Sequence, residues 1–247
     1  MVCPPDASAT SIEEDDEVPH DDHPPTVSQL IEAGRDHEAA QRGVAEAASR
    51  HRDRSHNPDG GQMDPLTQLS HLGPALGGVV GGITPDQLDR PTPCADFTVR
   101  GVLEHMVVGA TAFAAAYRDE EPAQPDLSDP LHRFGPALDD LAAAMSAPGA
   151  LDRTVAAPFG EVPGETFARF VVLDGLVHGW DMARATGQPY DPPDELVAAV
   201  DAFAHEALDP LRDGQTFADA VEPADDASPI EKLAAYTGRR PMTGATR

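Results

Sequence analysis

The sequence predicts an all-α protein folded as an antiparallel bundle of helices. From Leu66 onward, apolar residues recur with the three- and four-residue spacing of helices that bury one face. No segment shows the sustained alternation of apolar and polar residues that is typical of a half-buried strand. The chain has 247 residues, 40% of them hydrophobic, which is enough for one domain with a buried core.

The first 62 residues differ from the rest in composition. They contain charged blocks at residues 12–17 and 50–56 and few large apolar side chains. Such a segment cannot bury enough apolar surface to offset the entropy lost on folding. We expect residues 1–62 to be a disordered, acidic, histidine-containing extension. A mis-assigned start codon, with Met63 as the true start, is an equally good interpretation.

The bundle is expected within residues 63–241, and residues 242–247 are expected to be a tail. Thr98 is a suitable N-cap for the second helix, and Gly187 suits the C-cap of the fourth. The stretch between the third and fourth helices contains proline and glycine and is expected to be a connection, and a tail of low apolarity follows the fifth helix. We expect helices at about residues 65–82, 99–118, 130–145, 164–186 and 193–208.

The charge of the chain excludes some partners. The formal net charge is −26, with 43 acidic residues against 17 lysines and arginines, so nucleic acid and anionic membranes should be repelled. Cys3 and Cys94 are too few and too far apart for a disulfide framework, and no export signal is visible. We expect a cytoplasmic protein, monomeric or homodimeric, that binds neither nucleic acid nor membranes.

Two predicted helices carry side chains that can bind a metal. Asp174 and His178 are four residues apart, so they share one face of their helix. His105 lies on another helix, between Gly101 and Gly109, which should leave space beside the imidazole. Two imidazoles and one carboxylate form a ligand set that Zn²⁺ accepts, with a fourth position left for water or substrate.

The position of Asp174 on an apolar stripe requires a compensating charge. A metal ion could supply it, but so could Arg169 or Arg184, and the spacing leaves both interpretations open. Asp181 could hydrogen-bond a ligand imidazole, or it could be a surface acid paired with Arg184. The second helix should begin near Thr98, seven residues or about 10 Å before His105. Cys94 precedes this helix and is therefore an unfavourable ligand.

Three segments, residues 91–105, 174–187 and 227–241, resemble actinobacterial metal-binding proteins related to mycothiol-dependent maleylpyruvate isomerase. These proteins belong to the DinB-like four-helix-bundle superfamily. The resemblance implies a DinB-like four-helix bundle with an extra C-terminal helix. It also implies a divalent metal, often zinc, held by a histidine of the second helix and an acid-x-x-x-histidine pair, here His105, Asp174 and His178.

The resemblance further implies a metal- and thiol-dependent transferase or isomerase that acts on a small electrophile, with mycothiol as cosubstrate. Two departures are visible: the isomerase has glutamate where Asp174 stands, and this chain is too short for the isomerase's second domain. Maleylpyruvate is therefore not the expected substrate. The alternatives are a non-catalytic metal-binding or regulatory module, or a helical interaction protein whose three polar residues form an internal ion pair.

Overall fold

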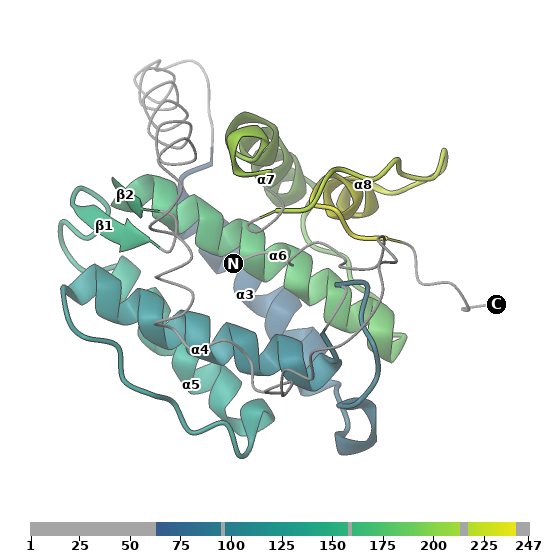
Figure 1. Ribbon diagram of the computed structural model, residues 1–247, viewed down its shortest axis with the longest axis horizontal. Helices are drawn as coiled ribbons and strands as arrows, with labels where there is room; N and C mark the ends of the chain where they lie inside the picture. The colour runs from purple at the N-terminus through teal and green to yellow at the C-terminus, as the bar shows by residue number, and fades with distance from the viewer. Residues whose placement is uncertain (1–62, 95–96, 158–159, 213–216, 241–247) are drawn as a thin grey trace, which may run out of the picture.

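The computed structural model describes residues 63–94, 97–157, 160–212 and 217–240. The expected extension at residues 1–62 and the tail at residues 242–247 lie outside these ranges. The described part contains the predicted bundle (Figure 1). Its helices are α3 (Pro65–Gly81), α4 (Val99–Arg118), α5 (Pro130–Met145), α6 (Gly164–Thr186), α7 (Asp194–Ala207) and α8 (Pro229–Tyr236).

The first four of these helices form the bundle, which confirms the predicted fold class. α5 packs along α4, α3 packs along α6, and α6 also contacts α4. α7 and α8 pack on α6, on the side away from α5 (Figure 1). Of the described helices, only α4 is long and apolar enough to cross a membrane, and here its apolar face is packed in the bundle.

The ends of the helices are determined by local capping. The Asp64 side chain accepts hydrogen bonds from the first free N–H groups of α3, and Thr98 accepts one from the Gly101 N–H at the start of α4. Gly187 ends α6 with a φ of 74°, a left-handed conformation that favours glycine. Each of these capping residues lies within four residues of a helix end. The ends of the helices could therefore be predicted from the local sequence.

The central helix of the fold is α6. All of its residues except Glu165 and Arg184 are buried, so it has almost no solvent-facing side. α3 approaches it closely at Gly175, where an added Cβ would lie 2.8 Å from Leu72 Cδ2. A helix covered on all sides can hold polar side chains in the interior, away from water.

Two elements of the fold differ from the prediction. Strands β1 (Thr154–Ala157) and β2 (Gly160–Pro163) form an antiparallel hairpin where only a connection was expected. Each strand has four residues, and Val155 and Val162 are the buried residue in each. One buried side chain per strand is too little to produce a recognisable alternation. The hairpin therefore could not be recognised in the sequence, and the fold remains mainly helical.

The second difference is α8, which lies in the stretch of low apolarity that was expected to follow the fifth helix. Ser228 and Glu231 form a capping box at its start, and Ile230 and Leu233 are buried. Two short 3₁₀ helices, η1 (Pro85–Gln87) and η2 (Asp209–Leu211), complete the described elements. The apolar side chains of α8 were too few for a sequence-based assignment, but in the fold they attach the C-terminal segment to α6 and α7.

Candidate metal centre

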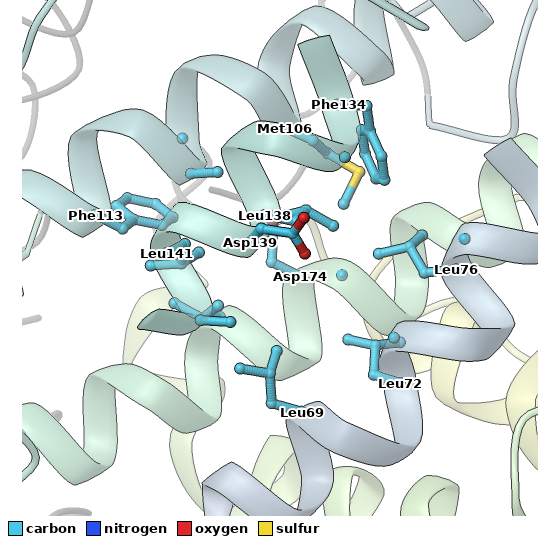
Figure 2. A pocket seen from close by; sticks show the side chains of 18 residues that line it. Leu69, Leu72, Leu76, Met106, Phe113, Phe134, Leu138, Asp139, Leu141 and Asp174 are labelled. Atoms are coloured by element: carbon cyan, nitrogen blue, oxygen red, sulfur yellow. The ribbon is translucent and has the colours of Figure 1, made fainter. Parts of the chain in front are cut away.

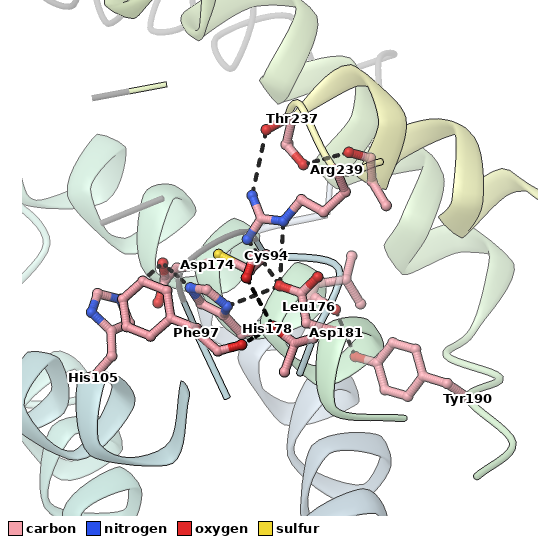
Figure 3. Close-up of polar contacts among 12 residues, drawn as sticks. Cys94, Phe97, His105, Asp174, Leu176, His178, Asp181, Tyr190, Thr237 and Arg239 are labelled. Atoms are coloured by element: carbon pink, nitrogen blue, oxygen red, sulfur yellow. Dashed lines mark hydrogen bonds and ion pairs between the residues drawn. The ribbon is translucent and has the colours of Figure 1, made fainter. Parts of the chain in front are cut away.

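The structure brings His105, Asp174 and His178 together between α4 and α6 (Figure 3). Nε2 of His105 lies 3.8 Å from Oδ1 of Asp174, and Nε2 of His178 lies 3.5 Å from the same oxygen. The two imidazole rings are 5.1 Å apart between centroids. One ligand atom from each residue lies within 4.8 Å of the other two, so all three can face a single ion.

These distances fit a divalent cation. On a tetrahedral Zn²⁺ ion, ligand atoms bonded at about 2.0–2.1 Å stand about 3.3 Å apart, slightly less than the separations observed here. Nε2 of His178 is buried and makes no hydrogen bond with any residue that the structure describes. A buried polar atom without a partner costs about 1–3 kcal/mol. A cation between the three residues would give this nitrogen a partner.

Two further buried residues, Asp181 and Arg239, orient His178. Nδ1 of His178 donates a hydrogen bond to Oδ2 of Asp181 at 3.0 Å, and Arg239 donates to the same oxygen from Nη2 at 3.0 Å and from Nε at 3.3 Å. Burial alone would raise the pKa of Asp181, but Arg239 and His178 lower it below its usual value. Asp181 therefore stays ionised and holds the His178 proton on Nδ1, which leaves the Nε2 lone pair free for an ion.

The arginines expected near Asp174 have other partners. Arg169 pairs with Glu165 at 2.9 Å, and Arg184 lies 3.9 Å from Glu231. Neither pairs with Asp174, so the structure does not support the arginine ion pair that the spacing left open. The surface interpretation of Asp181 is also not supported, because this residue is fully buried.

Arg239 belongs to the site, although its sequence position did not indicate this. It lies 58 residues after Asp181 in the chain and is only 2% exposed. Arg239 follows the end of α8. Thr237 is the C-cap of this helix, and Gly238 adopts a φ of 90°, so that the chain changes direction and the Arg239 side chain is buried. The Thr237-Gly238-Arg239 motif was visible in the sequence, but no local pattern indicates which acid a distant arginine will meet.

The surroundings of the cluster correct two further expectations. The space expected beside His105 at Gly101 is occupied, because a Cβ there would lie 3.0 Å from the ring of Phe97. Cys94 is buried, and its sulfur lies within 4.8 Å of possible ligand atoms of His178 and Asp181, which the sequence did not suggest.

Burial lowers the pKa of His105 from its usual 6.5 to about 4. The imidazole is therefore neutral at physiological pH, which is the form that binds a metal. In the unfolded chain the same histidine should titrate near its usual value. Between these two pKa values only the unfolded state binds the proton, so stability must rise with pH over this interval.

We expect the metal-free protein to lose about 2 kcal/mol of unfolding free energy through His105 as the pH falls from 7.5 to 5. Urea denaturation at both pH values in the presence of a chelator measures this loss. His105→Gln should make the loss smaller by that amount, whereas His205→Gln, at an exposed histidine, should not. An equal pH dependence in the wild type and His105→Gln would contradict the neutral, buried imidazole.

A cavity of about 310 Å³ adjoins the cluster (Figure 2). Its walls come from α3, α4, α5 and α6 and consist mainly of apolar side chains, and Asp174 forms part of them. Trp180, the only tryptophan, packs in the core and is not among the lining residues. Asp174 therefore belongs both to the three-residue cluster and to the wall of a pocket that could admit a small molecule.

Comparisons with known proteins identify a family match and two relatives of this chain. Residues 69–183 match the family described as "Mycothiol maleylpyruvate isomerase N-terminal domain", and this range includes His105, Asp174 and His178. Two uncharacterized proteins of Mycobacterium tuberculosis, from strains CDC 1551 / Oshkosh and ATCC 25618 / H37Rv, are each 35% identical over 181 residues. Each alignment covers 72% of this chain and 98% of the relative. No solved structure gives a significant match.

Proposed function

Because this chain belongs to the mycothiol maleylpyruvate isomerase N-terminal domain family, we propose that His105, Asp174 and His178 hold a divalent cation, with zinc the first candidate. We further propose that the protein is a transferase or isomerase that uses a thiol of the mycothiol type and acts on a small electrophile. The observation that carries the proposal is the convergence of three ligand groups, one with an unsatisfied buried nitrogen, beside a pocket.

The pocket favours catalysis over a purely structural or regulatory ion. Structural zinc sites are closed by four protein ligands, whereas catalytic sites have three and leave a position open. Here three groups converge, and Asp174 also faces the pocket. A divalent cation bound there would supply a Lewis acid that lowers the pKa of a coordinated thiol or water.

The residues of the chain set the charge of the site. Two neutral imidazoles and one carboxylate would leave one positive charge of a divalent ion uncompensated, which favours an anionic ligand such as a thiolate. The Asp181–Arg239 pair adds no net charge, so it orients His178 without altering this balance. Asp174 has a shorter side chain than the glutamate expected from the family, which restricts how its carboxylate can reach the ion.

We expect the purified protein to contain about one divalent ion per chain, because the three groups form a single site. Elemental analysis measures this content. After exchange with Co²⁺, titration with a small thiol should change the visible bands, since an open position would admit the thiolate. The corresponding thioether, which cannot ionise, should leave the bands unchanged.

Each result separates the three interpretations of the cluster. A stoichiometric ion and thiol-sensitive bands support the proposed enzyme. A stoichiometric ion whose cobalt bands respond to no thiol favours the non-catalytic metal-binding module instead. Absence of a bound ion, even after incubation with zinc, would leave the three residues as an internal polar cluster and remove the basis of the proposal.

A further inference from the structure

The pocket beside Asp174 has an open side between α3 and α5. α5 packs along α4 and α3 packs along α6, and the pocket lies between these two helix pairs (Figure 2). Gly73 and Gly77 of α3 and Gly135 of α5 line it and are exposed. The exposed part of the lining therefore includes three positions without side chains, and Asp174 of α6 forms another part of the wall.

These three glycines are not required by the backbone. Their φ values are not in the left-handed region, and an added Cβ would meet nothing within 4 Å at any of them. Glycine inside a helix is less stable than alanine by about 0.5–1 kcal/mol. Because these glycines line the pocket and have open space around them, we expect a large side chain at any of them to narrow it.

The charge of the lining restricts what can enter. Asp139 and Asp174 are its only charged residues, and lysine, arginine and histidine are absent from it. A cation bound by Asp174 would compensate that carboxylate, but Asp139, an exposed residue of α5, would remain (Figure 2). An anionic group placed away from the cation would lose water against apolar walls and also face a carboxylate.

We propose that this pocket binds the apolar body of the substrate, and that the substrate carries no negative charge except at the end that reaches Asp174. This inference rests on the proposed function, because it assumes that the reacting end lies at the cluster. The volume of about 310 Å³ is near the lower limit of small-molecule pockets, about 300–1,000 Å³. The substrate class is thus a small, apolar electrophile, and a compound with a carboxylate at each end is excluded.

The matched dyes N-phenyl-1-naphthylamine and 1-anilinonaphthalene-8-sulfonate test this inference. They share an aromatic body, fluoresce in apolar sites and differ by one sulfonate. We expect the neutral dye to bind once per chain, and the anionic dye to bind at least about tenfold more weakly. Fluorescence titration of the chelator-treated protein gives both affinities. Equal affinities would overturn the charge requirement.

Variants of the glycines test whether the dye occupies this pocket. Gly77→Leu should weaken binding of the neutral dye at least about tenfold, because the side chain fills the pocket. Gly78→Leu is the matched control, since Gly78 is the next residue of α3, is exposed, and does not line the pocket. Gly135→Leu provides a second block from α5, should Gly77→Leu fail to fold. Equal binding by Gly77→Leu, Gly135→Leu and Gly78→Leu would overturn the pocket assignment.

The role of Asp139 is separated from that of the overall negative charge by a second pair of variants. Asp139→Asn should raise the affinity for the anionic dye about threefold or more and leave the neutral dye unchanged. Asp152→Asn removes the same unit of charge at an exposed position outside the pocket and should change neither affinity. The same gain in both variants would show that only the net charge excludes the anion, which contradicts the local mechanism.

The outcome is distinguishable from that of the metal proposal, because the dye titrations are made without metal. Neutral-dye binding that is lost in Gly77→Leu, in a protein that binds no ion, would support the pocket and refute the metal centre. If the protein binds one ion per chain and the Gly77→Leu variant binds the neutral dye as tightly as the wild type, only the pocket assignment is refuted.

Discussion

Replacing Arg239 by methionine is expected to lower the free energy of unfolding of the metal-free protein by about 3–5 kcal/mol. The change removes the guanidinium but keeps an apolar side chain of similar length. It leaves the ionised Asp181 fully buried, with His178 as its remaining hydrogen-bond partner among the residues described. Urea denaturation followed by circular dichroism measures the loss.

Arg240→Met is the matched control, since Arg240 is the next residue and is exposed. It should change stability by less than about 0.5 kcal/mol. Adding Asp181→Asn to Arg239→Met should recover part of the stability, because the buried charge is removed together with its partner. A loss in Arg239→Met no larger than that in Arg240→Met would show that the ion pair contributes nothing to the fold.

Asp174→Asn is expected to weaken binding of Zn²⁺ more than about 100-fold. Loss of a group that only orients a metal ligand already costs about 10–100-fold, and Asp174 is proposed to contact the ion itself. The amide has nearly the same shape as the carboxylate but carries no negative charge, so the compensation of the cation is lost. Competition with a chromogenic chelator measures the affinity.

Two further variants make this result specific to the cluster. Asp139→Asn removes a carboxylate from the same pocket but not from the three-residue group, and it should bind zinc as the wild type does. Asp174→Glu restores the charge with the longer side chain expected from the family and should recover binding at least in part. Unchanged affinity in Asp174→Asn would exclude this residue as a ligand and, with it, the proposed site.

Local features of the chain were sufficient to predict most of the bundle. The helical spacing of apolar residues and capping groups such as Asp64 and Thr98 act within a few residues, so the ends of α3 to α6 could be read directly. Asp174 and His178 belong to one helix, and their four-residue spacing places them together without knowledge of the fold. His105 was proposed as the third ligand because of its residue type, and the family resemblance supported this choice, but helix spacing does not say which helices are neighbours.

The elements that could not be predicted depend on contacts between distant parts of the chain. The hairpin has one buried residue in each strand, and α8 is stabilised largely by its packing on α6 and α7. The side chains of such short elements give little pattern of their own.

The helical spacing of the residues was enough to predict a helical chain with an acid-x-x-x-histidine pair on one apolar helix. The packing of the helices was needed to show that Arg239 orients His178 through Asp181, and that four helices leave a cavity at Asp174. The physical reason is that helical spacing and capping are interactions among neighbouring residues. The partner of a buried charge and the shape of a cavity depend instead on how whole helices pack, which no short segment encodes.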